Sequence, residues 1–321
     1  MERNLVVVLP VTEAKHRERI LAAAVRHGFS VQFFANGQEA LPELSKAEVV
    51  LGQSAFLAQN APKLRWLCTP SAGVDQFLGG GVFAAPDALL SNSSGAYGVT
   101  IAEHIVMVTL ELMRRQMEYN GIVSRREWRR DLPIRSIHGS RIALLGTGDI
   151  GREAALRLRA FSPACLVGMN RSGRNPNGLF DRIISESELD AVLPGTDLLI
   201  LSLPDTPETC GILNGKRLDL LPRDAYLVNV GRGSAIDQRA LETLLRSGRL
   251  AGAALDVFEQ EPLPRDSGLW DCPRLLVTPH VAGNMTLAYT VDRIIDQFLE
   301  DFENYCAGRP LAHLVDRKMG Y

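Results

Sequence analysis

The stretch Ile142-Ala143-Leu144-Leu145-Gly146-Thr147-Gly148-Asp149-Ile150-Gly151 decides the fold of the second half of the chain. A short apolar run, typical of a buried strand, leads directly into the pattern G-x-G-x-x-G and then into a helical stretch. Gly146 permits the tight turn, Gly148 lets the backbone approach a pyrophosphate, and Gly151 lets the helix pack closely on the sheet. The helix N-terminus would add unpaired N–H groups and a positive dipole end.

This strand–turn–helix context predicts a dinucleotide-binding site, with a purely structural turn as the alternative. A mononucleotide P-loop is excluded because Arg152, rather than a Lys-Ser or Lys-Thr pair, follows the last glycine. The residues expected to contact the cofactor here are Gly146, Thr147, Gly148, Asp149, Ile150 and Gly151.

The end of the next strand, Met169-Asn170-Arg171-Ser172-Gly173-Arg174, bears on which dinucleotide binds. An acidic residue here would hydrogen-bond the free ribose 2′-hydroxyl of NAD. Asn170 takes that place, and no carboxylate follows before Asp181. Arg171 and Ser172 offer donors for a 2′-phosphate. The loop therefore predicts NADP(H) in preference to NAD(H), contacted by Asn170, Arg171 and Ser172; an NAD enzyme that tolerates asparagine here is the alternative.

Short β-branched runs alternate with helical stretches along the chain, which is typical of an α/β fold with parallel sheets. The 321 residues are enough for two domains. The first series has expected strands at Leu5–Leu9, Val31–Ala35, Val49–Gly52, Leu64–Thr69 and Ala88–Ser91. The second has them at Ile142–Leu145, Leu166–Met169, Leu198–Leu203, Tyr226–Val230, Ala253–Val257 and Leu275–Thr278. Long helices are expected at Thr100–Ser124 and Leu287–Cys306.

Composition excludes several classes of protein. The net charge is −2, so a basic surface for nucleic acid or an anionic membrane is not expected. The five cysteines form no Cys-x-x-Cys pair, which argues against a disulfide framework or a thiolate zinc site and predicts a reducing cytoplasm. No signal peptide or membrane-spanning stretch is recognised. The arginine-rich segment 125–135 around Trp128 predicts a solvated arm or subunit interface, with a nucleic-acid patch as the alternative.

Three further segments lie at expected strand ends in the second half of the chain. They are Val228-Asn229-Val230-Gly231-Arg232-Gly233, Asp256-Val257-Phe258-Glu259-Gln260-Glu261-Pro262-Leu263-Pro264 and Val277-Thr278-Pro279-His280-Val281-Ala282-Gly283. They bring an arginine, a carboxylate and a histidine into succession. Loops at the carboxyl ends of parallel strands converge on the cofactor crevice, so Arg232, Glu261 and His280 can reach one substrate.

Together with the glycine turn and Ser71-Ala72-Gly73-Val74-Asp75, these segments resemble the D-isomer-specific 2-hydroxyacid dehydrogenase family over essentially the whole chain, most closely its glyoxylate/hydroxypyruvate reductase-like branch. The resemblance implies that Arg232 pairs with the substrate carboxylate and carbonyl, that His280 is the acid/base, and that Glu261 holds the imidazole. The chemistry agrees with these roles. A hydride arriving at C2 of a 2-oxo acid leaves charge on the carbonyl oxygen, which needs a proton and a nearby positive group, and no metal is required.

The resemblance also implies a domain layout and further contacts. Residues 1–96 and 284–321 would form a flavodoxin-like substrate domain, and residues 97–283 a Rossmann domain inserted into it. Ser71, Ala72 and Gly73 would bind the substrate carboxylate, and Asp256 the nicotinamide carboxamide, unless it is a strand-end cap. The other expected cofactor contacts are Leu203, Pro204, Thr209, Val230, Gly231, Ala282 and Gly283. A homodimer is expected, and Trp270 is placed either near the substrate or in the core.

The expected activity is reduction of a small 2-oxo acid to the D-2-hydroxy acid. Other members of the family fit less well: phosphoglycerate dehydrogenases often carry an extra C-terminal domain, formate dehydrogenases place glutamine where Glu261 stands, and D-lactate-type enzymes usually keep the acid that Asn170 replaces. A cofactor-sensing interaction protein is the alternative from another class, although such relatives typically carry long flanking tails.

Overall fold

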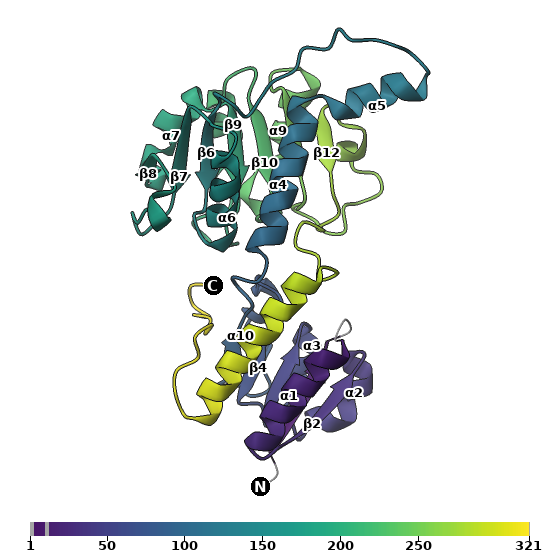
Figure 1. Ribbon diagram of the computed structural model, residues 1–321, viewed down its shortest axis with the longest axis vertical. Helices are drawn as coiled ribbons and strands as arrows, with labels where there is room; N and C mark the ends of the chain where they lie inside the picture. Colours follow the sequence, from purple (N-terminus) through teal and green to yellow (C-terminus); the bar gives the residue numbers. More distant parts are fainter. Residues whose placement is uncertain (1–2, 10–12, 321) are drawn as a thin grey trace. The chain divides into compact units, whose positions relative to one another are not determined.

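The computed structural model describes residues 3–9 and 13–320. The chain divides into two compact units (Figure 1), one made of residues 1–97 with 284–321 and the other of residues 98–283. Every strand pair in both units is parallel. The predicted α/β fold with parallel sheets is confirmed.

The first unit contains a five-stranded sheet in the order β2-β1-β3-β4-β5, which is the flavodoxin order. The strands are β1 (Arg3–Val8), β2 (Phe29–Phe34), β3 (Val49–Gly52), β4 (Trp66–Cys68) and β5 (Leu89–Ser91). The helices are α1 (Ala14–Arg26), α2 (Gly37–Leu44), α3 (Ala55–Gln59) and α10 (Ala288–Cys306).

Helix α10 comes from the far end of the chain and completes the core of this unit. Its Phe298 stacks on Trp66 of β4 with ring centroids 5.4 Å apart, and Phe302 packs beside both rings. All three side chains are fully buried. Ion pairs join α10 to α1, among them Arg19 with Asp296. Because these contacts link the two ends of the sequence, the unit is discontinuous along the chain.

The second unit contains a seven-stranded sheet in the order β12-β11-β10-β9-β6-β7-β8. Numbered from its own first strand, this is the Rossmann order with one strand added, and the order reverses between β6 and β9. The strands are β6 (Arg141–Leu145), β7 (Cys165–Met169), β8 (Arg182–Ile184), β9 (Leu198–Leu201), β10 (Tyr226–Asn229), β11 (Gly252–Leu255) and β12 (Leu275–Val277). The helices are α4 (Gly98–Met113), α5 (Gln116–Ser124), α6 (Asp149–Arg159), α7 (Leu189–Val192), α8 (Gly215–Leu220) and α9 (Gln238–Arg246).

The central strands of this sheet are buried along their whole length, because helices cover the sheet. Helix α4 packs against α6 and on β10 and β11. Strand β8 was not expected from the sequence. In residues 3–9 and 13–320 no helix has both the length and the apolar composition that crossing a bilayer requires.

The prediction of a single helix over Thr100–Ser124 is wrong, although the segment is helical on both sides of a break. The structure has two helices, α4 and α5, because Arg115 takes a left-handed conformation with φ of 55°. The side chain of Arg115 then pairs with Glu118 in the first turn of α5, at 2.7 Å. Apolar residues recur on both sides of the break, so the hydrophobic period gives no sign of it. Figure 1 shows α5 and the segment after it reaching out from the sheet.

Candidate active site

The glycine turn between β6 and α6 has the geometry that a pyrophosphate requires. Gly146 has a φ of 98°, and a Cβ there would lie 2.7 Å from the carbonyl oxygen of Ser202. A Cβ on Gly151 would overlap the carbonyl oxygen of Gly146, so no larger residue lets α6 pack this closely. A Cβ on Gly148, in contrast, would meet nothing within 4 Å. The turn therefore leaves open space at the glycine that should face the phosphates, and the residues present fit a dinucleotide.

The other side chains of this turn make internal contacts. The Thr147 hydroxyl accepts a 2.6 Å hydrogen bond from the Asn170 amide, and Asn170 also donates to the Arg174 carbonyl. The carboxylate of Asp149 lies against Gly98 and 3.3 Å from Arg152. Asn170 thus ties the loop after β7 to the glycine turn.

The loop after β7 holds the residues expected to choose the cofactor. Arg171 and Ser172 are exposed, and the Ser172 hydroxyl donates to the Asn170 side chain at 3.2 Å. Asp181, the nearest carboxylate in sequence, pairs with Arg159 and accepts from the N–H of Leu166, the second residue of β7. It is therefore held at the opposite end of β7 from Asn170.

The loops after β9 and β10 approach each other closely, next to the point between β6 and β9 where the strand order reverses. A Cβ on Gly231 would lie 2.6 Å from the Leu203 carbonyl oxygen, so this contact depends on glycine. The Thr209 hydroxyl donates to the Pro204 carbonyl at 2.6 Å and closes the loop after β9. Val230 is buried at the end of β10. These expected cofactor contacts therefore lie together at the crevice where open α/β sheets bind ligands.

Asn229, to which the sequence analysis gave no role, holds the loop that carries Arg232. Its amide donates to the Arg232 carbonyl at 2.9 Å and its side-chain oxygen accepts from the Gly231 N–H at 3.0 Å. A Cβ on Gly233 would overlap the backbone of Phe258. The Arg232 loop therefore abuts the loop that carries Glu261. The sequence does contain a signal for the role of Asn229: it is a polar residue at the end of a buried apolar strand, shortly before Gly231-Arg232-Gly233.

His280 and Glu261 form a direct pair. The Nδ1 atom of His280 lies 2.7 Å from Oε2 of Glu261, and the other carboxylate oxygen accepts from the Phe258 N–H at 2.9 Å. The carboxylate is thus fixed on two sides and directs the imidazole, whose Nε2 is left to exchange a proton. The His280 side chain is 52% exposed, so the ring is accessible.

The backbone of His280 is held in an unusual conformation by Asp256. Its φ is 53°, a left-handed geometry that costs about 1 kcal/mol for a residue with a Cβ. The Asp256 carboxylate accepts from Thr278 Oγ1 at 2.6 Å, Val281 N–H at 2.9 Å and Ala282 N–H at 3.0 Å. The His280 N–H donates to the Asp256 carbonyl. Asp256 therefore acts as the strand-end cap that the sequence analysis left open.

His104 of α4 joins this polar group, in which Asp256 is buried and both Thr278 and His104 are partly exposed. Its Nε2 lies 3.4 Å from Thr278 Oγ1, and burial lowers the pKa of its imidazole below the ordinary value, while the charge of Asp256 opposes that shift. Of the other expected contacts, Ala282 is buried and Gly283 is partly exposed. The hydrogen bond from the Ala282 N–H to Asp256 fixes the backbone at this point of the chain.

A cavity of about 480 Å³ adjoins the His280–Glu261 pair. Apolar side chains dominate its wall, including Trp270, which is half-exposed and donates from Nε1 to the Pro264 carbonyl at 2.8 Å. A purely core role for Trp270 is therefore wrong. The lining residues are Phe258, Glu261, Pro262, Leu263, Trp270, Val277, Pro279 and His280.

In the first unit, Ser71, Ala72 and Gly73 form a loop after β4. The Ser71 hydroxyl donates to the Gly73 carbonyl at 2.7 Å, and the Asn92 amide donates to the Ala72 carbonyl at 2.8 Å. Across residues 3–9 and 13–320, the N–H groups of Ala72 and Gly73 meet no acceptor, and both residues are partly exposed. The loop thus presents two backbone donors to solvent. The same described residues contain no cluster of His, Cys, Asp and Glu suited to a metal ion.

Comparison with known proteins gives a consistent result. Residues 106–282 match the family model of the D-isomer specific 2-hydroxyacid dehydrogenase NAD binding domain. The chain is 35% identical over 226 residues to glyoxylate/hydroxypyruvate reductase A from Salmonella newport (strain SL254), covering 70% of each chain.

Two solved structures resemble the whole chain. A D-isomer specific 2-hydroxyacid dehydrogenase family protein from Aeromonas salmonicida is 32% identical with a TM-score of 0.87, covering 99% of this chain and 100% of that one. An NADPH-dependent glyoxylate/hydroxypyruvate reductase from Sinorhizobium meliloti, in complex with NADP and sulfate, is 30% identical with a TM-score of 0.83, covering 100% of both chains.

Proposed function

The chain belongs to the D-isomer specific 2-hydroxyacid dehydrogenase family, and we propose that it uses NADPH to reduce a small 2-oxo acid of the glyoxylate and hydroxypyruvate kind. The single observation that carries the chemistry is the His280–Glu261 pair, 2.7 Å apart and accessible. An imidazole oriented by a carboxylate is suited to give a proton to a carbonyl oxygen near neutral pH. The product is the D-2-hydroxy acid.

Three side chains have separate roles in the proposed reaction, namely His280, Glu261 and Arg232. Bound NADPH supplies the hydride for C2 of the substrate. His280 gives its Nε2 proton to the oxygen that becomes the hydroxyl, while Glu261 stabilises the imidazolium before the transfer and holds the neutral ring with its proton on Nδ1 afterwards. Arg232 binds the substrate carboxylate through its planar fork and stabilises charge on the reacting oxygen. Asn229 and Asp256 position the Arg232 and His280 loops.

The two units are proposed to share the binding. Residues 98–283 bind the cofactor through the glycine turn, whose open side at Gly148 supports this assignment. Residues 1–97 with 284–321 bind substrate through the Ala72 and Gly73 N–H groups. The preference for NADPH is supported by Asn170 in place of an acid, by the adjacent Arg171 and Ser172, and by the NADP bound to the Sinorhizobium meliloti relative.

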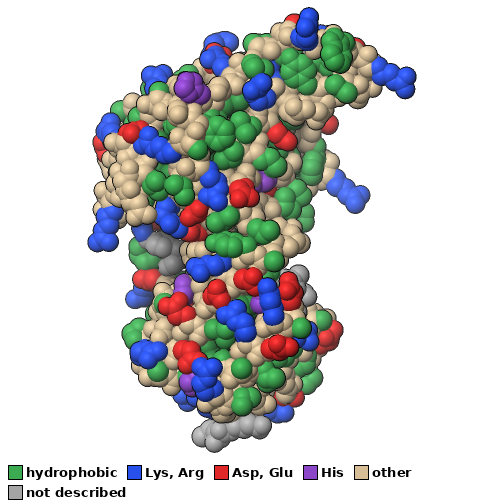
Figure 2. Space-filling model, viewed as in Figure 1, with side chains coloured by type: hydrophobic (Ala, Val, Ile, Leu, Met, Phe, Trp, Pro, Cys, Tyr) green, Lys and Arg blue, Asp and Glu red, His purple; other side chains and the backbone are tan. Residues whose placement is uncertain are grey.

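A homodimer in the cytoplasm is the proposed working form. The arm after α4 exposes large apolar side chains, with Val123 69%, Trp128 92% and Ile134 48% exposed, and Figure 2 shows hydrophobic side chains gathered over this region. Such exposure marks interaction surfaces. The spacing of the five cysteines, none of which forms a Cys-x-x-Cys pair, supports a reducing compartment.

The arm provides a test of the dimer. Trp128→Ser should lower the molar mass measured by light scattering after gel filtration from that of a dimer toward that of a monomer. His138→Gln, an exposed substitution in the same unit, is the control. A wild-type protein that elutes as a monomer, or a Trp128→Ser variant with unchanged mass over a dilution series, contradicts this assembly.

Turnover with a panel of 2-oxo acids tests the activity itself. NADPH consumption should be measured with glyoxylate, hydroxypyruvate, pyruvate and phenylpyruvate, followed by chiral analysis of the product. We expect the highest kcat/KM with one of the first two and a product of D configuration. NADPH binding without turnover of any acid would favour the cofactor-sensing alternative, and a preference for phenylpyruvate would move the substrate class toward acids that fill the apolar cavity at Trp270.

A further inference from the structure

In the first unit, the loop after β4 and the loop after β5 lie side by side. The two strands are paired in parallel, and their last residues are partners in the ladder. Residues 69–73 and 92–97 therefore leave the sheet at the same edge. The N–H of Ser93 donates to the Ser71 carbonyl at 3.0 Å, so the two loops are in direct contact.

Every carbonyl group from Thr69 to Gly73 accepts a hydrogen bond, and most of the donors belong to residues 92–97. The bonds run from Ser93 Oγ to Thr69 at 3.1 Å, Tyr97 Oη to Pro70 at 2.6 Å, Ser93 N to Ser71 at 3.0 Å, Asn92 Nδ2 to Ala72 at 2.8 Å and Ser71 Oγ to Gly73 at 2.7 Å. The loop after β4 therefore cannot turn one of these carbonyl groups outward without losing a bond.

The same bonds decide where the N–H groups of this loop point. In a planar trans peptide, the carbonyl group and the N–H of the following residue point in opposite directions. The bond to the Ser71 carbonyl thus turns the Ala72 N–H away from residues 92–97, and the bond from Asn92 to the Ala72 carbonyl does the same for the Gly73 N–H. Successive N–H groups that face one way are suited to bind an anion.

The amide of Asn92 is fixed at both of its polar atoms. The residue is buried, with 7% of its surface exposed, and its Oδ1 accepts from the Ser94 N–H at 3.3 Å. This contact leaves Nδ2 to donate to the Ala72 carbonyl. Ser94 is in turn tied to α10, because the buried side chain of Gln297 donates to the Ser94 carbonyl at 2.8 Å. A Cβ at Gly95 would lie 2.9 Å from that Nε2, so this approach of α10 depends on glycine.

We propose that Asn92 is a positioning residue for the substrate carboxylate, an inference that rests on the function proposed above. Its amide holds the Ala72 carbonyl toward residues 92–97 and thereby keeps the Gly73 N–H directed at a carboxylate oxygen. The Ser71 carbonyl is held by a backbone N–H, which no side-chain substitution removes. A change at Asn92 should therefore release one of the two donors and leave the Ala72 N–H in place.

Steady-state reduction by the full chain at saturating NADPH tests this role. Asn92→Ala should raise KM for the best 2-oxo acid about tenfold, which is the lower value for losing a hydrogen bond to a charged group. The kcat should change by less than about twofold, because the donor binds the carboxylate equally in the ground state and the transition state. The Ki of oxamate, an unreactive analogue of a 2-oxo acid, should rise by the same factor as KM, and the Kd of NADPH should stay unchanged.

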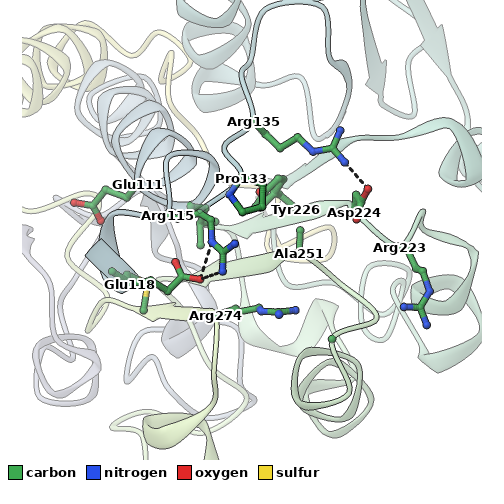
Figure 3. A pocket seen from close by; sticks show the side chains of 13 residues that line it. Glu111, Arg115, Glu118, Pro133, Arg135, Arg223, Asp224, Tyr226, Ala251 and Arg274 are labelled. Carbon is green, nitrogen blue, oxygen red and sulfur yellow. Dashed lines mark hydrogen bonds and ion pairs between the residues drawn. The ribbon is translucent and has the colours of Figure 1, made fainter. Parts of the chain in front are cut away.

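The isosteric variant Asn92→Asp keeps the test valid if the alanine variant does not fold. Its carboxylate can still accept from the Ser94 N–H, but it has no hydrogen to donate and repels the Ala72 carbonyl. KM should therefore rise at least as much as in Asn92→Ala. Arg223→Gln is the control for charge, because it changes the net charge by the same amount. Arg223 lines a pocket of residues 98–283, and Figure 3 shows its guanidinium directed away from Arg135 of the arm.

Asn60→Ala is the matched control for the loss of a bond from an amide to a carbonyl group. In the same unit, Asn60 Nδ2 donates to the Phe56 carbonyl at 2.8 Å. This variant and Arg223→Gln should keep the wild-type KM and oxamate Ki. A folded Asn92→Asp enzyme with wild-type KM and Ki would overturn the inference, and so would an equal rise of KM in Asn60→Ala. A wild-type protein that reduces no 2-oxo acid would instead refute the proposed function, and this inference with it.

Discussion

His280 is constrained through both its side chain and its backbone. Glu261 fixes the ring at Nδ1, and the Asp256 cap holds the loop in its left-handed geometry. Removing the imidazole should therefore remove the proton donor without disturbing the cap, whose bonds involve Thr278, Val281 and Ala282. His280→Ala is expected to lower kcat for reduction by ~10²–10⁴, the range for a positioned acid.

The pH dependence provides a second measurement for this residue. Because reduction consumes a proton and oxidation releases one, kcat for reduction should fall as the pH rises, whereas oxidation of the D-hydroxy acid should speed up. The variant should lose this dependence while its NADPH affinity, followed by fluorescence, stays near that of the wild type. A His280→Ala enzyme with wild-type kcat on its best substrate would refute the assignment.

At the scale of elements, two glycines of the turn from β6 to α6 have different roles: Gly151 is needed for packing, and Gly148 for cofactor binding. A methyl group at Gly151 would overlap the Gly146 carbonyl, whereas one at Gly148 meets only open space. Gly151→Ala should lower the thermal midpoint, since overpacking costs about 1–3 kcal/mol. Gly148→Ala should unfold like the wild type but bind NADPH more weakly. Scanning calorimetry and fluorescence titration measure the two effects, and equal loss of stability in both variants would contradict this division.

The loop after β7 is the element expected to set cofactor choice. Arg171→Ala should raise the KM for NADPH roughly 10–150-fold and leave that for NADH nearly unchanged, because a charge-assisted bond to the 2′-phosphate is lost. Asn170→Asp should move preference toward NADH by repelling the phosphate and bonding the free hydroxyl. The measurement is the ratio of kcat/KM for the two cofactors. A wild-type enzyme that prefers NADH, or an unchanged ratio in Arg171→Ala, rejects the prediction.

The elements that could be predicted from the sequence are those governed by local rules. The apolar runs of the buried strands, the glycine turn and helix α10 follow from side-chain period and backbone freedom. The break at Arg115 could not be predicted, because an arginine carries no signal for positive φ. The capping role of Asp256 depends on Thr278, Val281 and Ala282, which follow much later in the sequence. Strand β8 is short and begins with arginine, so its pattern is weak.

At the scale of the whole molecule, stability should depend on pH through the C-terminal segment. A hydrogen bond to the buried carboxylate of Asp301 raises the pKa of His313 above its ordinary value. Its stabilisation is therefore complete below the unfolded pKa of ~6.5 and is lost as the pH rises through the folded-state pKa. His313→Gln should lower the thermal midpoint by about 2 °C near pH 6 and by less near pH 9.

Comparison with a second histidine isolates this effect. His16 and His27 also face carboxylates, so the wild-type protein alone does not report on His313. The quantity to compare is the difference between variant and wild type at each pH, with exposed His138→Gln as the matched control. If the amount by which His313→Gln lowers the thermal midpoint stays constant, or grows, as the pH rises, the prediction is contradicted.

The discontinuous first unit has a consequence for synthesis on the ribosome. Domains generally fold as units and in order of emergence. Here Trp66 emerges early, but its partners Phe298 and Phe302 are translated only after the whole of residues 98–283. The middle of the chain can therefore fold before the first unit is complete, while the part of the first sheet that α10 covers, including Trp66, remains exposed. Such strands are targets for holding chaperones, and a ribosome stalled before codon 298 would release a chain whose second unit is folded and whose first unit is not.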